Sequence, residues 1–128
     1  MFVGVLRLSL SIVGARSLKD KRSVVRSFKE RVQARLKVSI AEVGGLDDPR
    51  RATLGISVVS NEASVCDHVL ASVAAMANTL PDAILTDRAT EIVAFGEGGS
   101  GIAGGIDQLG SSSDDDDDDD DDDEENGE

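Results

Sequence analysis

Apolar and polar side chains alternate along the first segment of the chain. In residues 2–13, leucines occupy positions 6, 8 and 10, while Arg7, Ser9 and Ser11 occupy the positions between and after them. A period of two places successive side chains on opposite faces of a β-strand. The segment therefore predicts a strand with one buried face and one polar face.

The pattern changes to a helical period after residue 16. Ser17 and Asp20 form a short-armed version of the capping box, which predicts a helix that begins at Ser17. At about 100° per residue, the apolar residues of 17–37 gather on one side of this helix. They are Leu18, Val25, Val32 and Leu36, with Phe28 on their flank.

Four further segments complete the pattern. The β-branched alternation of 37–43, the turn residues of 44–50 and the alternation of 52–60 predict two strands joined by a loop. A helix capped by Ser60 or Asn61 and stopped by Pro81 follows, and 83–95 predicts a last strand. The order βαββαβ favours an α+β, ferredoxin-like fold, an antiparallel sheet with both helices on one face.

Composition divides the 128 residues into three parts. We expect a ferredoxin-like domain at 1–96, a Gly/Ser-rich linker at 97–113 and a disordered acidic tail at 114–128. The last 18 residues hold 13 acids and no bases, so they produce the formal net charge of −12, and residues 1–110 are close to neutral with 12 acids and 13 bases. No signal peptide or transmembrane segment is evident, and a single cysteine suits a reducing compartment. We therefore expect a soluble cytoplasmic protein with no membrane partner.

Basic residues concentrate in the first predicted helix. Residues 16–37 carry nine of the 13 Lys and Arg but only two acids, Asp20 and Glu30, for a local balance of +7. This surplus favours a polyanionic partner such as RNA, against the alternatives of a solvated helix face and of a docking site for the chain's own tail. The candidate RNA-binding residues are Lys19, Lys21, Arg22, Arg26 and Lys29. The first three lie near the helix N-terminus, whose free amides also favour anions.

Four stretches of the chain resemble a known family. "SLKDKRSVVRSFKERV", "VSIAEV" and "RATLGISVVSNE", followed by "TDRATEIV", are similar in order and spacing to the YlxP-like family of small bacterial proteins, whose function is not known. The resemblance spans about residues 1–95 and implies a ferredoxin-like fold. It also implies, through gene neighbourhood alone, a role near the ribosome. Family members carry aromatic residues near Pro49 and Arg88 that this chain lacks, and the acidic tail is not part of the family pattern.

The shortage of aromatic residues limits how RNA could be bound. There is no Trp or Tyr, and the polar face of the first strand offers Arg7, Ser9 and Ser11. A domain that stacks bases on sheet aromatics is therefore disfavoured, and we expect contact with the phosphate backbone of structured RNA, such as rRNA in a ribosomal particle. The alternative function is a protein-interaction module that forms a homodimer through its sheet and engages a basic partner with its tail.

No residue set points to catalysis. Paired carboxylates, a nucleophile triad and metal-ligand spacing are not visible, so we expect a non-enzymatic protein with no cofactor and no metal site. Glu42, in an otherwise apolar strand, is interpreted as an ion-pair partner of an Arg on the neighbouring helix, or as a functional carboxylate. The aspartate run has three interpretations: a mimic of nucleic acid that folds back on the basic helix, a recruiter of a basic partner, or an inert solubility tail.

Overall fold

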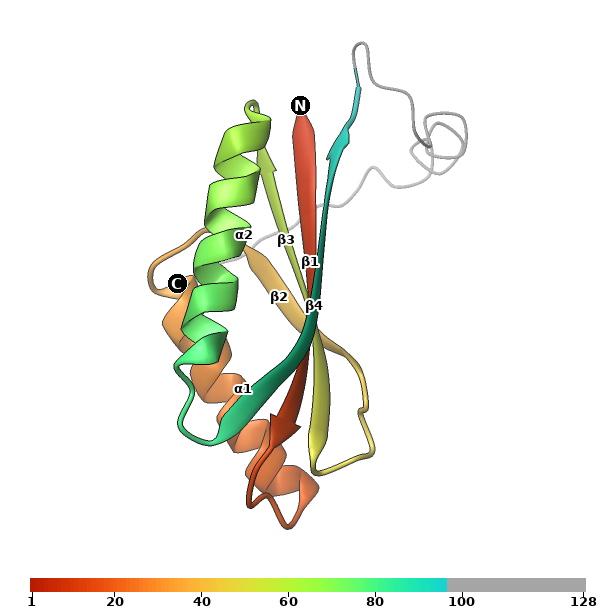
Figure 1. Cartoon of the computed structure of the whole chain (residues 1–128), viewed down its shortest axis with the longest axis vertical. Helices are drawn as coiled ribbons and strands as arrows, with labels where there is room; N and C mark the ends of the chain where they lie inside the picture. The colour runs from red at the N-terminus through yellow and green to blue at the C-terminus, as the bar shows by residue number, and fades with distance from the viewer. Residues whose placement is uncertain (97–128) are drawn as a thin grey trace, which may run out of the picture. The chain divides into compact units, whose positions relative to one another are not determined.

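Residues 1–96, the part that the computed structural model describes, form one sheet and two helices (Figure 1). The elements are β1 (Phe2–Ile12), α1 (Leu18–Gln33), β2 (Ser39–Gly44), β3 (Arg51–Ser60), α2 (Ala63–Asn78) and β4 (Ala83–Ala94). This order is the predicted one. The expected linker at 97–113 and acidic tail at 114–128 lie outside the described residues.

The sheet has the strand order β2-β3-β1-β4, with every neighbouring pair antiparallel, so β2 and β4 are its edges. Both helices lie on one face (Figure 1): α2 packs on β1, β3 and β4, and α1 packs on β2 and β3. The predicted ferredoxin-like fold is confirmed. We call the sheet face opposite the helices the open face. Neither helix of residues 1–96 is long and apolar enough to cross a bilayer.

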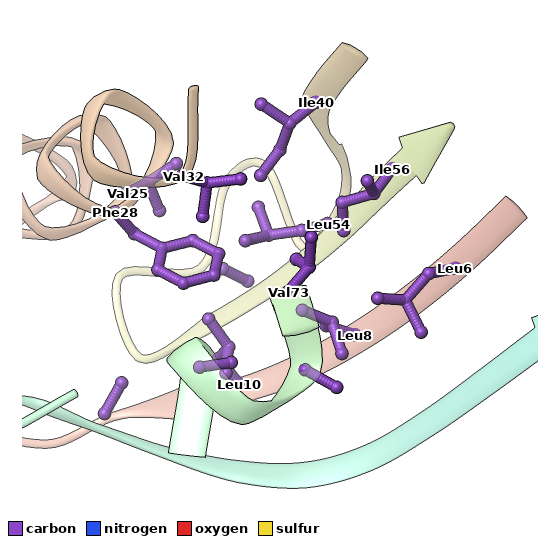
Figure 2. Close-up of a cluster of buried hydrophobic side chains, with 14 of the residues drawn as sticks. Leu6, Leu8, Leu10, Val25, Phe28, Val32, Ile40, Leu54, Ile56 and Val73 are labelled. Atoms are coloured by element: carbon purple, nitrogen blue, oxygen red, sulfur yellow. The ribbon is translucent and has the colours of Figure 1, made fainter. Parts of the chain in front are cut away.

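Aliphatic side chains fill the space between the sheet and the helices. Figure 2 shows Phe28 and its neighbours on α1 directed toward residues of the sheet, among them Leu54 on β3 and Leu8 and Leu10 on β1. These side chains are buried, while Arg7, which precedes Leu8 in β1, is exposed. The alternation in β1 is thus confirmed, and it fixes which side chains face the helices and which lie on the open face.

The first helix is shorter than its pattern indicates. It ends at Gln33, where the amides of Arg35 and Leu36 both bond the carbonyl of Val32, a tightened final turn. Leu36 still packs against the core, but Lys37 lies in the segment that leads into β2. Pairing with β3 begins at Ser39, and this extended backbone cannot continue the helix. The prediction that Lys37 lies on the helix is wrong.

A bulge accounts for the imperfect alternation of the last strand. The β1–β4 register shifts between Ser9 and Leu10, so that these residues pair with Asp87 and Leu85, and Thr86 is the extra residue. The Thr86 hydroxyl donates to the carbonyl of Ser9 at 3.1 Å. Odd-numbered residues of β4 therefore face the helices before the bulge, and even-numbered residues face them after it.

Candidate functional site

The N-terminus of α1 is capped as predicted. The Ser17 hydroxyl accepts a hydrogen bond from the amide of Asp20 at 3.1 Å, and the Asp20 carboxylate accepts one from the amide of Arg16 at 3.0 Å. A cap of this kind stabilises a helix by about 1 kcal/mol. Because Asp20 brings a negative charge to the first turn, a phosphate finds less attraction there than the helix dipole alone would provide.

Lys21 does not lie on the surface. Its side chain is 1% exposed, and its ammonium group donates to the carbonyls of Gly45, Arg51 and Leu46 at 2.6, 3.1 and 3.4 Å. All three carbonyls belong to the connection between β2 and β3 and to its junction with β3. With its donors engaged and its charge enclosed, this ammonium group cannot reach a phosphate. The surface position that the RNA-binding prediction assumed for Lys21 is therefore wrong.

Glu42 on β2 supplies the charge partner of Lys21. Its Oε2 lies 2.6 Å from the Lys21 Nζ, and its side chain is 16% exposed. The sequence predicted an ion pair with an Arg of the neighbouring helix, and the structure shows an ion pair with a Lys of that helix. The same oxygen accepts no well-aligned hydrogen bond within residues 1–96, so the pairing is Coulombic, and the directed bonds of the ammonium group go to the carbonyls.

The buried pair fixes the β2–β3 connection to α1. Gly45 has a φ of +68°, a left-handed conformation that suits glycine. Its carbonyl oxygen is the carbonyl nearest to the Lys21 ammonium group. The residues of this connection are largely exposed, but the three carbonyls face the enclosed ammonium group, and a carbonyl held away from water without a partner costs about 1–3 kcal/mol. Lys21 thus has a structural role that joins three elements: α1, the connection and β3.

The other four predicted residues form a surface along one side of α1, which we call the basic edge: Lys19, Arg22, Arg26 and Lys29. Lys29 is half-buried, and the other three are exposed. Arg22, Arg26 and Lys29 line a shallow hollow of about 220 Å³, completed by Val25 and Glu42. The spacing of i, i+4 and i+7 puts these three cations on one face, with about 10 Å of helix rise between the first and the last.

The charges of the basic edge are not neutralised by the folded domain. Within residues 1–96, ion pairs form only between Arg7 and Asp87 and between Lys21 and Glu42, so none of the four cations has a carboxylate partner there. Exposed pairs contribute little to stability in any case, about 0–1 kcal/mol each. The four positive charges are therefore free to act on an outside partner.

Other chemistry-bearing residues do not assemble into a site. Cys66 is buried, as predicted, and its thiol lies 3.7 Å from the carbonyl of Phe2, whereas His68 is exposed on α2. No three side chains of the His, Cys, Asp and Glu types meet in metal-binding geometry within residues 1–96.

The open face offers hydroxyl groups and aliphatic side chains. A hollow of about 430 Å³ is lined by Ser9, Ser11, Arg51, Thr53, Thr86 and Asp87, among others. The guanidinium of Arg7 and the carboxylate of Asp87 form an exposed ion pair at 3.2 Å beside it. As predicted, the side of β1 away from the helices carries Arg7, Ser9 and Ser11 and no ring on which a base could stack.

The fold and the basic edge together define a small ferredoxin-like α+β domain with a polarised first helix. The model of the DUF503 family, described as a protein of unknown function, matches residues 3–90, and the chain belongs to this family. It is 34% identical over 89 residues to the uncharacterized protein YlxP of Bacillus subtilis (strain 168). That match covers 70% of this chain and 97% of the relative, and it confirms the resemblance found in the sequence.

Solved structures support the same fold. A de novo designed protein with a ferredoxin fold superimposes with a TM-score of 0.50 at 15% identity, covering 76% of this chain and 90% of the designed one. A putative chlorite dismutase gives a TM-score of 0.42 at 19% identity, over 73% of this chain and 45% of that one. The first likeness shows the fold alone, and the second is too distant to support any argument about chemistry.

Proposed function

We propose that this protein is a non-enzymatic, cytoplasmic RNA-binding protein whose basic edge docks on structured RNA, in the context of a ribosomal particle or its precursor. The observation that carries the proposal is the set of four cations on α1 that have no carboxylate partner within residues 1–96. Cations that the domain leaves unpaired attract a phosphate backbone and release its condensed counterions on binding.

The arrangement of the cations favours the middle of α1 over its N-terminus. Asp20 adds negative charge at the first turn, and Lys21 is enclosed, whereas Arg22, Arg26 and Lys29 surround a hollow. The two arginines beside this hollow support phosphate contacts, because a planar guanidinium group can donate hydrogen bonds to two phosphate oxygens at once. The proposed footprint is therefore Arg22, Arg26 and Lys29, with Lys19 at its border.

The proposed binding mode is recognition of shape and charge. Contacts to phosphate position a protein on a nucleic acid without reading its sequence. Base readout on a sheet requires aromatic side chains, and the open face of β1 presents none, since Phe2 packs against the core. Such binding has little sequence preference, and its target is selected by the spacing of phosphates in folded RNA.

The dependence of affinity on salt tests this proposal. A fluorescein-labelled 24-nucleotide RNA hairpin titrated with the full chain between 50 and 300 mM KCl should give a log–log slope of about −3, as four phosphate contacts predict. Co-sedimentation of the chain with 30S particles at 50 mM KCl, lost at 300 mM, is the matching result for the particle. A slope near zero, or no binding at 50 mM KCl, would refute the proposal.

A second candidate function rests on the open face. Each strand presents a large exposed aliphatic side chain there: Val5 on β1, Val43 on β2, Val59 on β3 and Ile84 on β4, each 44–61% exposed. A face of this kind can pair with a second copy, which gives the homodimeric interaction module, with the acidic run available to a basic partner.

Sedimentation equilibrium separates the second candidate from the first. If the open face forms a dimer, the full chain at 50 µM should have twice the monomer mass, with little change between 50 and 300 mM KCl, since apolar contacts are not screened. Val5→Lys together with Val59→Lys should restore the monomer mass. A monomer at 50 µM in both salts would exclude this candidate.

A further inference from the structure

The basic edge and the C-terminal acids of this chain have complementary charge. The edge carries four positive charges without an ion pair in residues 1–96, and residues 111–128 carry 13 acids without a base. The acidic run also lies outside residues 3–90, the part shared with the family, and the match to the Bacillus subtilis relative accounts for 97% of that protein. The run is thus an addition to the family domain, and its role must be sought in this chain.

We propose that residues 114–128 bind the basic edge of their own chain and compete there with RNA. This inference rests on the proposed function, because it assigns a regulatory role to the surface that holds the phosphates. The acidic run occupies the place of a phosphate backbone, so only an RNA that outcompetes it gains access.

The spacing of charges fits this occupant. Arg22 and Arg26 are four residues apart, a rise of about 6 Å along the helix. In an extended chain, side chains on the same side recur about every 7 Å, so alternate aspartates match successive cations of the edge. Ten consecutive aspartates, Asp114 to Asp123, also offer many equivalent registers, and each register adds to the probability that the edge is occupied.

The other cations of residues 1–96 are paired, enclosed or gathered in smaller number. Arg7 is paired with Asp87, and Lys21 is enclosed with Glu42. Arg31 is exposed on the last turn of α1 and Arg35 is exposed just after the helix, but neither lines the hollow formed by Arg22, Arg26 and Lys29. Arg16 and Arg50 line another hollow, of about 360 Å³, but it holds two cations where the hollow of the basic edge holds three. Among the described residues 1–96, the basic edge therefore offers a polyanion more cations than this second hollow does.

The tether length permits the contact and sets its strength. The 17 residues of 97–113 can span at most about 56 Å, which exceeds the diameter of about 35 Å expected for a domain of this size. A short tether gives the acidic run an effective concentration on the order of 1 mM at the basic edge. If the run binds the edge with a dissociation constant of about 0.1 mM, typical of weak polyanion binding, RNA affinity falls about tenfold.

A tail-neutral full chain tests the competition. In this variant Asp114–Asp123 become Asn, and Glu124, Glu125 and Glu128 become Gln, so the length is unchanged. Affinity for the fluorescein-labelled 24-nucleotide hairpin at 50 mM KCl should rise about tenfold, and the gain should fall below twofold at 300 mM, where the competing contact is screened. Equal affinities at 50 mM KCl would overturn the inference and favour an inert or partner-recruiting tail.

A matched pair of substitutions separates docking from general repulsion by the acids. With Arg22→Gln, Arg26→Gln and Lys29→Gln, neutralising the tail should no longer raise affinity by more than twofold. With Arg31→Gln, Arg35→Gln and Lys37→Gln, which remove the same charge elsewhere, the tenfold gain should persist. A gain of equal size in both backgrounds would mean repulsion without docking and would overturn the inference.

A measurement without RNA keeps this inference distinct from the proposed function. Carbodiimide joins carboxylates to amines in contact without adding a spacer. In the full chain at 5 µM, we expect cross-links within one molecule from the acidic run to Lys19 and Lys29. Cross-links to Lys37 should be fewer, and the enclosed Lys21 should form none. Such links without RNA binding would refute the proposed function but support the docked tail. RNA binding without preferential cross-links would support the proposed function but refute the docked tail.

Discussion

Replacing Lys21 by methionine is expected to lower the free energy of unfolding by about 3–5 kcal/mol. The substitution keeps most of the side-chain volume but leaves the Glu42 carboxylate at its buried position without a counter-charge. It also removes the donor from the carbonyls of Gly45 and Arg51. Domains of this size are stable by about 5–15 kcal/mol, so the loss is a large fraction of the total. Urea denaturation followed by circular dichroism measures it.

Two further variants show whether the loss of stability comes from the buried ion pair. Lys21→Met combined with Glu42→Met removes both charges and should recover part of the stability, because a buried charge without a partner costs more than an apolar pair. Lys19→Met, on the same helix but exposed, should change stability by less than about 0.5 kcal/mol. A loss below about 1 kcal/mol for Lys21→Met would show that the buried pair does not fix the β2–β3 connection.

Reversing three charges of the basic edge is expected to weaken RNA binding by about 100-fold or more. Arg22→Glu, Arg26→Glu and Lys29→Glu replace the cations that line the hollow. At a modest 1 kcal/mol for each phosphate contact, the loss amounts to about 3 kcal/mol, or two orders of magnitude. The log–log salt slope should also become shallower by about two, because one of the four phosphate contacts remains. Anisotropy with the labelled hairpin at 50 mM KCl measures both quantities.

The control for this variant changes the same charge at other positions. Arg31→Glu, Arg35→Glu and Lys37→Glu alter exposed residues outside the basic edge, so affinity should fall by less than tenfold. Urea denaturation of both triple variants checks that α1 is intact. Equal losses in the two variants would mean that RNA responds to net charge alone, and the assignment of the footprint to the basic edge would be abandoned.

The periodic patterns were sufficient to predict the fold. Strict alternation from Leu6 to Ile12 and the Ser17 cap predicted β1 and the start of α1, because one buried face and one capping oxygen are properties of neighbouring residues. The end of α1 was missed, since the residues up to Lys37 are compatible with a helix and only pairing with β3 requires an extended chain from Ser39. The bulge opposite Ser9 likewise depends on a neighbouring strand.

Lys21 shows why the candidate site was only partly predictable. Residues 21, 25, 28 and 32 follow the helical spacing i, i+4, i+7 and i+11, and all four are buried. A lysine on the apolar side of the helical wheel is the signal that could have revealed its role, but its charge placed it with the surface cations. Its partner Glu42 was noticed because a carboxylate stood out in an apolar strand. The pairing itself requires contact across 21 residues of sequence.

The position of β2 at the margin of the sheet has a consequence for solubility. Backbone groups along such a margin can hydrogen-bond to a strand of another molecule, and this is how sheets polymerise. Here Arg22, Arg26 and Lys29 flank that margin beside Glu42. Two molecules that approached margin to margin would bring like charges together before any ladder could form. The cations proposed to hold a polyanion thus also disfavour pairing between the β2 edges of two molecules.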